Sequence, residues 1–311
     1  MSDLLSEEFL TALISGGLIA AIPLLYASLG ELVSEQAGVL NVGLEGYMLS
    51  GAFLAFVVSY NTGSEWLGML AGIVAGAGMA VIMAVLCVRL NLDQIVIGIA
   101  IILLAEGATS LIHGAAYAES RPSLGSPSEL EIPLLKEIPI IGESVFSQHP
   151  IVYIGIALAF VVAWVLRRTS AGLSVRAAGE RPEALDAAGV SVVATRTWAT
   201  LFAGAMAGLG GAFLVIVGAG SFTPFITQGA GFIAIVIAML ARGKAPWTIV
   251  GAILFGMSLS IATALQLIGV EIQTDYVQML PFIVVIVVLV LFARRSYLPA
   301  ALALPYVRGE R

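Results

Sequence analysis

Long apolar stretches, each about 18 to 23 residues, recur along this chain, and a helix of that length crosses the roughly 30 Å of hydrocarbon in a bilayer. The composition agrees, because 59% of the 311 residues are hydrophobic and 11% are charged, whereas a soluble domain carries about 25% charged residues. The 34 glycines favour close approach of helix backbones within a membrane. We therefore predict an all-α fold, a polytopic bundle of membrane helices.

Apolar runs bounded by charged or turn residues define the expected spans. The sequence predicts about nine transmembrane helices, roughly eight to ten. They are 9–30, 44–60, 66–88, 94–113, 150–166, 197–218, 229–241, 247–268 and 277–293. The range stays open because 229–241 is short for a span and 31–46 is apolar enough to hold a further short or re-entrant segment. All the spans belong to a single transmembrane domain that covers 1–311.

Basic residues lie at alternating ends of these spans, and Lys and Arg near span ends stay on the cytoplasmic side of a membrane. With those ends inside, only Arg121 and Lys136 of the 14 Lys and Arg residues fall outside. The sequence thus predicts a multi-pass protein of the cytoplasmic (inner) membrane with its C-terminus inside. An acidic, proline-rich connection at about 114–150 then faces outward as an irregular cap, and a connection at about 169–196 faces the cytoplasm.

The cytoplasmic connection contains the pattern of a short helix from Pro182 to Ala188. Proline suits the first helical position, Glu183 places negative charge at the positive end of the helix dipole, and Gly189 supplies the left-handed residue that ends the helix. The body is narrow and nearly smooth, and consists of Ala184, Leu185, Ala187 and Ala188. A helix this short is marginal on its own in water, so we expect it to dock on a partner. The alternative is a linker lying on the membrane surface.

Several segments together resemble one family of transport proteins. The segments GERPEALDAAG (179–189) and AGAMAGLGGA (203–212) resemble the coupling loop and the following helix of ABC-importer permeases of the sugar, nucleoside and branched-chain amino-acid group. EQAGVLNVGLEG (35–46) resembles the hallmark near the start of these permeases, and NLDQIVIG (91–98) is similar to a segment at the entry of a middle span. The likeness covers nearly the whole chain. The combination of Asn41, Gly43, Glu45 and Gly46 most resembles the nucleoside-importer branch.

The resemblance implies a division of labour between subunits. A separate ATP-binding cassette ATPase would contact the short helix, a second permease chain would complete the path, and an extracytoplasmic solute-binding protein would deliver the solute. The implied ATPase contacts are Gly179, Glu180, Pro182, Glu183, Ala184, Asp186, Ala188 and Gly189. This chain would be no enzyme and would bind no cofactor, and ATP would be used by the partner. It lacks a G-x-x-x-x-G-K-[ST] loop, since Gly243-Lys244 is followed by Ala245 and has no upstream glycine at the required spacing.

Polar side chains at membrane depth usually face the bundle interior or a water-filled cavity. As candidate translocation-path residues we select Asn41, Glu45, Gln94 and Gln266, from a wider set that also holds Glu106, Gln228 and Gln278. In a helix, Asn41 and Glu45 would share one face. In the alternative interpretation, Glu45 caps a broken helix or pairs with a basic group, and the glutamines make interhelical hydrogen bonds.

Two glycine-rich span entries, 43–46 and 227–231, each carry a polar side chain and run in opposite directions in the predicted topology. Inverted repeats of this kind place the solute path at their interface near the membrane midplane. The match is short, and the repeat is a hypothesis.

Other functional classes find little support in the residues. His113 and His149 are far apart in the sequence, Cys87 is the single cysteine, and no H-E-x-x-H pattern occurs, so we expect neither a metal site nor an intramembrane enzyme. The net charge of −6 disfavours a nucleic-acid partner. Membrane lipid is the expected surroundings of the apolar spans. An ion-coupled secondary transporter remains the alternative on composition alone.

The predicted solute is a nucleoside, with a simple sugar or a branched-chain amino acid as the alternatives. A free amino acid carries two charges, and the spans lack a strong charge pair to match them. A ribosyl solute asks only for neutral hydrogen-bonding groups such as the amides of Asn41, Gln94 and Gln266.

Overall fold

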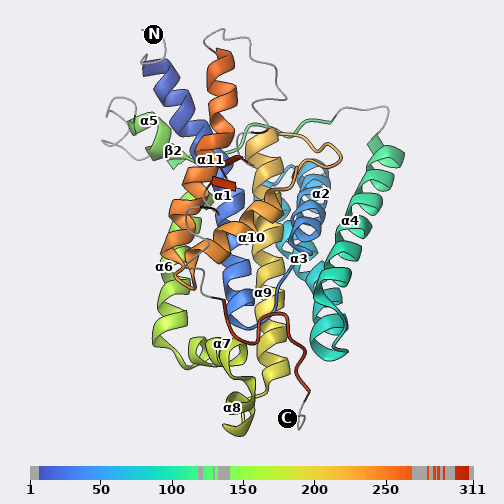
Figure 1. Cartoon of the computed structure of the whole chain (residues 1–311). Helices are drawn as coiled ribbons and strands as arrows, with labels where there is room; N and C mark the ends of the chain where they lie inside the picture. Colours follow the sequence, from blue (N-terminus) through green and yellow to red (C-terminus); the bar gives the residue numbers. More distant parts are fainter. Residues whose placement is uncertain are drawn as a thin grey trace.

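A computed structural model describes residues 7–117, 122–128, 130–131, 141–267 and 298–307, together with 279, 283–284, 286–287 and 290. The described part is a helical bundle (Figure 1). Its helices are α1 (Glu7–Gln36), α2 (Leu44–Thr62), α3 (Glu65–Met83), α4 (Gln94–Tyr117), α5 (Ile141–Phe146), α6 (Pro150–Arg168), α7 (Ser170–Glu180), α8 (Pro182–Ala187), α9 (Val192–Phe213), α10 (Ala230–Ala241) and α11 (Pro246–Leu267). The π-helical turns η2 (Ala84–Arg89) and η3 (Leu214–Ala219) continue α3 and α9.

A two-stranded antiparallel pair is a small addition to the predicted all-α fold. Strand β1 (Leu130–Glu131) pairs with β2 (Ser147–Gln148), with Leu130 opposite Gln148. Together with α5 it gives local structure to the connection that we predicted as an irregular cap.

Five helical stretches of the described residues are long and apolar enough to cross a membrane. They are Phe9–Gln36, Glu65–Arg89, Gln94–Tyr117, Pro150–Arg168 and Val192–Ala219, and each contains or largely overlaps a predicted span. The predicted spans 44–60, 229–241 and 247–268 form α2, α10 and α11, of which α10 is only 12 residues long. Most of the predicted span 277–293 lies outside the described residues. The multi-pass helical fold is therefore confirmed, and the count of about nine stays a prediction.

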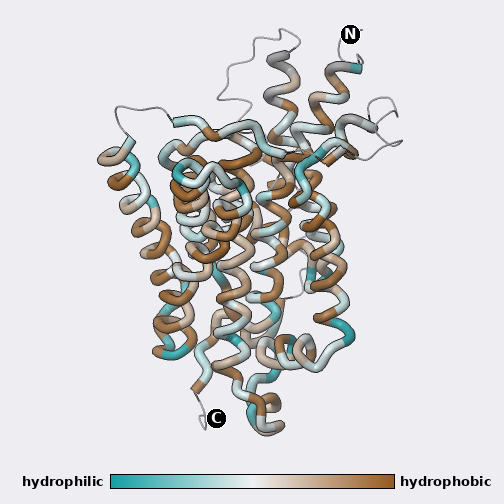
Figure 2. Tube along the Cα trace, turned by 180° about the vertical axis from the view of Figure 1, so that it is seen from behind, coloured by the Kyte–Doolittle hydropathy of each residue, from teal (hydrophilic) through white to brown (hydrophobic). Residues whose placement is uncertain are grey.

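The flanks of the bundle are apolar, as a lipid-facing surface requires. Figure 2 shows hydrophobic positions along the outer helices. Large exposed side chains include Leu111 on α4, 74% exposed, and Trp164 on α6, 61% exposed. In water such a surface would aggregate, so its natural solvent is lipid.

Helix α9 packs against α2 and α3 through glycines. A Cβ atom added to Gly51 of α2 would lie 2.5 Å from the Cα of Gly208, and one added to Gly76 of α3 would lie 2.7 Å from the same atom. Real Cβ contacts are longer, so no side chain fits between these backbones. The tight packing that the glycine content predicts is confirmed here.

Two helices begin inside the bundle. The connection 37–43 leads from α1 to α2, and 220–229 leads from η3 to α10, which lies in the middle of the bundle (Figure 1). Asn41 and Thr227 in these connections are buried. Of the range 31–46, in which the sequence allowed a further short or re-entrant segment, residues 31–36 belong to α1 and 44–46 to α2, which leaves only 37–43 between them.

Helices α7 and α8 lie at one end of the bundle, and α5 and β2 lie at the other (Figure 1). The C-terminal segment 298–307 joins the α7 end, because the N–H of Ala301 donates to the Gly179 carbonyl (2.8 Å) and the N–H of Ala303 donates to the Gly38 carbonyl (3.1 Å). The two polar connections that the sequence placed on opposite sides of the membrane therefore occupy opposite ends. Which end faces the cytoplasm stays a prediction.

Candidate translocation site and coupling face

Glu45, buried in the first turn of α2, holds the N-terminus of α10. Its Oε1 accepts hydrogen bonds from the Thr227 hydroxyl (2.5 Å) and the Gly229 N–H (2.9 Å), and its Oε2 accepts one from the Gly231 N–H (2.7 Å). The N–H groups that open a helix have no intrahelical acceptor, and a carboxylate there is also stabilised by the helix dipole. Glu45 is therefore the cap of an interrupted helix, as the alternative interpretation of this residue stated.

Glycine makes this contact between α2 and α10 possible. Gly229 adopts a left-handed conformation, with φ of 84°, as the N-cap of α10. A Cβ on Gly231 would lie 2.5 Å from the backbone nitrogen of Glu45. The two glycine-rich entries 43–46 and 227–231 are thus in direct contact inside the bundle. Their relation as an inverted repeat stays a hypothesis.

Two more candidate path residues, Asn41 and Gln94, lie at the connection between α1 and α2. The Oε1 of Gln94 accepts the N–H of Leu40 (2.9 Å), so this glutamine fixes the connection to α4. The backbone N–H of Asn41 donates to Oε1 of Glu31 (3.1 Å). Neither atom of the Asn41 amide has a hydrogen-bond partner of good geometry within the described part of the chain, and the polar side chain beside it is that of Tyr47.

Two acidic residues that we did not select from the sequence lie beside Asn41. Glu31 and Glu35 lie one helical turn apart in α1 and are almost fully buried. Tyr47 is also buried, close to Glu31 and to the Asn41 side chain. The signal was the i, i+4 spacing of two carboxylates, which the analysis passed over because it ended the first span at residue 30.

The other polar candidates lie elsewhere. Glu106 is half-buried on α4, and Gln228 is exposed on the connection before α10. Gln266 belongs to α11, but its side chain lies outside the described residues, and so does all of Gln278. Of the four selected path residues, the structure therefore brings Asn41, Glu45 and Gln94 to one region and does not place the side chain of Gln266.

The predicted short helix is α8, and it ends at Ala187, one residue earlier than predicted. Pro182 occupies its first turn, and Gly189 follows in a left-handed conformation with φ of 81°. Leu185, which we placed on the smooth outer body, instead points inward and packs with Ala178 and Val192. The outward face consists of Glu183, Ala184, Ala187, Ala188 and Gly189, which are all exposed.

The remaining residues of the implied coupling set are less accessible. Glu180 and Asp186 are half-buried, and Gly179 is buried where α7 approaches the end of α1. A Cβ on Gly179 would lie 3.0 Å from the backbone nitrogen of Gly38. Gly179 therefore sets the position of α8 and does not form part of its exposed face.

Arg196 joins this end of the molecule to α1. The buried guanidinium donates to the carbonyls of Ala37 (3.2 Å), Ala178 (3.2 Å), Ala301 (3.4 Å) and Leu304 (2.8 Å). One side chain thus connects α1, α7, α9 and the C-terminal segment. From the sequence, Arg196 was predicted only as one of the cytoplasmic charges, and its place in the first turns of an apolar helix was the signal of burial.

Interrupted helices that meet around buried polar groups, inside a bundle with lipid-facing flanks, are the architecture of a membrane transport protein. Within that class, the chain belongs to the family described as the permease component of the branched-chain amino acid transport system, whose model matches residues 13–289.

Relatives match the chain over nearly its full length. The guanosine ABC transporter permease protein NupQ of Bacillus subtilis is 35% identical, with 98% of this chain and 99% of the relative covered. The nucleoside ABC transporter permease protein NupC of Lactococcus lactis is 32% identical, with 97% and 98% covered. The putative glucose ABC transporter permease protein TsgC13 of Haloferax volcanii is 37% identical, with 80% and 76% covered.

Each of these three organisms also has a second permease relative, named for the same kind of solute and 25% to 30% identical to this chain. No solved structure matches the chain significantly.

Proposed function

We propose that this chain is the membrane-spanning permease subunit of an ABC importer for nucleosides. The observation that carries the proposal is the full-length similarity to permeases named for guanosine and for nucleosides, at 35% and 32% identity. The amide of Asn41 fits a neutral solute, because it offers both donors and an acceptor without charge.

A sugar is the second candidate solute. The relative from Haloferax volcanii named for glucose is 37% identical, but the match covers 80% of this chain against 98% for the guanosine relative. A branched-chain amino acid, for which the family is named, would need a partner for its ammonium and for its carboxylate. Beside Asn41 lie the acidic Glu31 and Glu35, which repel a carboxylate, and the guanidinium of Arg196, which contacts the same connection, already donates to four backbone carbonyls.

In this proposal α8 docks on the ATPase. Its exposed face is made of small side chains, which suits insertion into a groove, and Leu185 anchors it to the rest of the protein. The hydrogen bonds of Arg196 then connect that face to the end of α1 and so to the connection that carries Asn41. In this proposal, a movement of α8 is transmitted through these hydrogen-bonded backbone segments to the connection that carries Asn41.

The proposal also covers the membrane topology, the partner subunits and the roles of the candidate path residues. The chain would cross the cytoplasmic membrane with about nine helices, with the α8 end and the C-terminus inside. A second permease would complete the path, which the paired relatives in three organisms support. A solute-binding protein would dock at the opposite end, and the ATPase would use the ATP. Asn41 would contact solute, Gln266 would join it, and Glu45 and Gln94 would hold the surrounding backbone.

The solute is tested by uptake. Cells that lack their own nucleoside uptake, and that express this chain with its ATPase, second permease and binding protein, are expected to accumulate radiolabelled guanosine and uridine. Unlabelled guanosine should compete, and glucose or leucine in the same excess should not. Uptake of glucose or leucine without uptake of either nucleoside would contradict the solute assignment.

The docking face is tested in the same cells. Ala184→Trp places an indole on the exposed face of α8 and is expected to reduce nucleoside uptake at least about tenfold, because a groove fitted to small side chains excludes it. The matched control is Ala171→Trp, an exposed alanine on neighbouring α7. Equal uptake by the two variants, at equal amounts of protein in the membrane, would remove α8 as the docking helix.

A further inference from the structure

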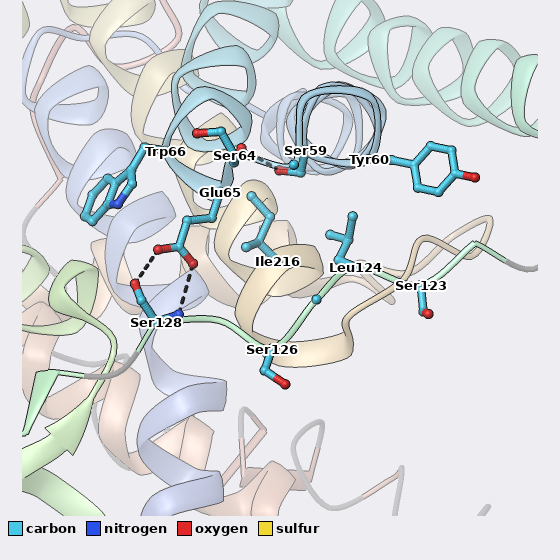
Figure 3. A pocket seen from close by; sticks show the side chains of 12 residues that line it. Ser59, Tyr60, Ser64, Glu65, Trp66, Ser123, Leu124, Ser126, Ser128 and Ile216 are labelled. Atoms are coloured by element: carbon cyan, nitrogen blue, oxygen red, sulfur yellow. Dashed lines mark hydrogen bonds between the residues drawn. The ribbon is translucent and has the colours of Figure 1, made fainter.

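A pocket of about 590 Å³ lies where the turn between α2 and α3 faces the segment 122–128 and Ile216 of η3 (Figure 3). The turn between α2 and α3 lies at the end of the bundle opposite α8 (Figure 1). Pockets that hold small molecules span roughly 300 to 1,000 Å³. Its size therefore fits a solute of the nucleoside class better than a protein surface, which needs a larger and flatter contact.

The pocket has fixed walls. Gly63, in a left-handed conformation, ends α2, and Ser64 caps α3 by accepting the N–H of Leu67 (3.4 Å). Across the pocket, the N–H of Leu124 donates to the Gly220 carbonyl (2.7 Å), which ties the segment 122–128 to the end of η3. The walls come from three separate parts of the chain, and each is held by backbone hydrogen bonds.

The lining combines hydroxyl-binding and ring-binding groups. Glu65 lies between Tyr60 and Trp66, whose side chains point toward opposite ends of the pocket, with Ser123 and Ser126 along the facing segment (Figure 3). Tyr60 and Trp66 are about half exposed, so each offers a ring face. The described lining includes no Lys, Arg or His, although the buried imidazole of His149 lies next to it, with Nε2 3.6 Å from Oε2 of Glu65. A carboxylate with hydroxyls and aromatic rings suits a neutral solute with several hydroxyl groups and a flat ring, and repels an anion.

Ser128 indicates how such a solute would bind Glu65. The N–H of Ser128 donates to Oε2 of Glu65 (3.1 Å), and its hydroxyl donates to Oε1. Two neighbouring donors thus bridge the two oxygens of one carboxylate. The adjacent hydroxyls of a ribose present the same pair of donors, so they can replace Ser128 with no loss of hydrogen bonds at Glu65.

We propose that this pocket is an entry site for the solute, in which ribose hydroxyls bind Glu65 in place of Ser128 and the base lies against Trp66. The assignment rests on the proposed nucleoside function. It adds a binding site, distinct from the buried region around Asn41, where the solute first contacts the permease.

The test is photolabelling of the purified full-length chain in lipid nanodiscs with 8-azidoguanosine. The label is expected on peptides that contain 59–66 and 122–128, and excess guanosine should displace it. Gly125 lines the pocket, and a Cβ there meets no atom within 4 Å, so Gly125→Trp adds a bulky side chain at the pocket wall and labelling should fall at least about tenfold. Gly114→Trp on α4, which is equally unobstructed, is the control and should label normally. Labelling confined to other peptides, or unchanged in Gly125→Trp, would overturn the site.

A second variant tests the role of the carboxylate. Glu65→Gln keeps the size of the side chain and removes one acceptor oxygen, so guanosine should compete at least about tenfold less well for the label. In the native chain, 2′,3′-dideoxyguanosine should compete as poorly as guanosine does in the variant. Equal competition by the two nucleosides would refute binding of ribose at Glu65. Failure of these tests, in cells that still take up nucleosides through this chain, rejects the pocket and leaves the proposed function standing.

Discussion

Glu45 is a single carboxylate that serves two helices. It lies in the first turn of α2 and accepts hydrogen bonds from the start of α10, so one buried negative charge faces two positive helix ends. Without it, the N–H groups of Gly229 and Gly231 would lie inside the bundle with no acceptor of equal strength. The carboxylate therefore has a structural role, and its loss should first lower the stability of the folded protein.

Glu45→Gln keeps the shape of the side chain but turns an NH₂ group toward N–H donors. We expect it to lower the free energy of unfolding by about 1 to 3 kcal/mol, the usual effect of leaving a buried polar group unsatisfied. The measurement is the Tm of the detergent-solubilised protein. Glu106→Gln on α4, where the carboxyl is half-buried, is the control. A Tm equal to that of the control would show that the cap contributes nothing.

The stability of the folded protein depends on pH through His149. Its Nδ1 accepts the N–H of Ile151 (3.2 Å) at the start of α6, and its Nε2 lies 3.6 Å from Oε2 of Glu65. Burial lowers the pKa of His149, and the Glu65 carboxylate opposes only part of that effect. As the pH falls, the unfolded chain therefore takes up a proton before the folded protein does. This contribution to stability is present above a pH of about 6.5 and is lost progressively below it.

We expect the Tm of the native protein to fall between about pH 7.5 and pH 5.5 more steeply than the Tm of His149→Gln. His113→Gln keeps His149 and should follow the native slope. The informative quantity is the slope with pH, because the substitution also removes the contact at the start of α6. Parallel slopes for the native protein and His149→Gln would contradict the assignment.

At the scale of elements, glycines set the distances between helices. Gly208 of α9 faces the backbones of Gly51, Gly72 and Gly76, so α2 and α3 both approach it without an intervening side chain. By contrast, Gly78 of α3 has no atom within 4 Å of an added Cβ. Both positions are glycine, but a side chain would have no room at Gly208 and open space at Gly78.

Gly208→Ala should therefore destabilise the protein by about 1 to 3 kcal/mol through overpacking against backbone that cannot move aside. Gly78→Ala should leave the stability unchanged or raise it by about 0.5 to 1 kcal/mol, because alanine favours the helix. Tm values of the two variants in the same detergent make the comparison. A similar loss in both would attribute the effect to alanine itself and not to the approach of α9.

Periodicity and length predicted the long helices well, because an apolar run bounded by charge has few alternatives in a bilayer. Pro182 and Gly189 similarly located α8 within one residue of its end. The interruption before α10 was harder to predict, since 229–241 is apolar throughout and only its shortness indicated a helix that begins inside the bundle.

At the site, Glu45 and Gln94 were found from their polarity. Their roles were open, because the sequence does not show that the acceptor atoms face backbone N–H groups.

Arg196 and the pair Glu31 and Glu35 were missed for a related reason. The burial of Arg196 follows from tertiary contacts between segments more than 100 residues apart, such as its hydrogen bond to the Leu304 carbonyl, and Glu31 contacts the connection after α1 that carries Asn41. Charge counting treats an arginine near a span end as a surface residue. Only the packing of α1, α7 and the C-terminal segment around its guanidinium makes it internal.

At the scale of the whole molecule, the two proposed sites, the pocket beside 122–128 and the exposed face of α8, lie at opposite ends of the bundle. We expect the first to face outward and the second to face the cytoplasm, from the distribution of basic residues. Ser126→Cys should label with a membrane-impermeant maleimide in intact cells, and Ala188→Cys only after permeabilisation. The native protein is the control, since Cys87 is buried. Labelling of both positions in intact cells would reverse or invalidate the topology.

The C-terminal segment has a consequence for the order in which the protein is made. Ala301 and Leu304 supply two of the four carbonyls around Arg196, and Ala303 bonds Gly38. A ribosome releases these residues after α1, α7 and α9 have been synthesised. Nascent chains therefore hold the guanidinium of Arg196 with two of its four carbonyl partners until Leu304 has emerged. A chain that terminated before Ala301 would contain α7, α8 and α9 but lack half of the hydrogen bonds that join them to the end of α1.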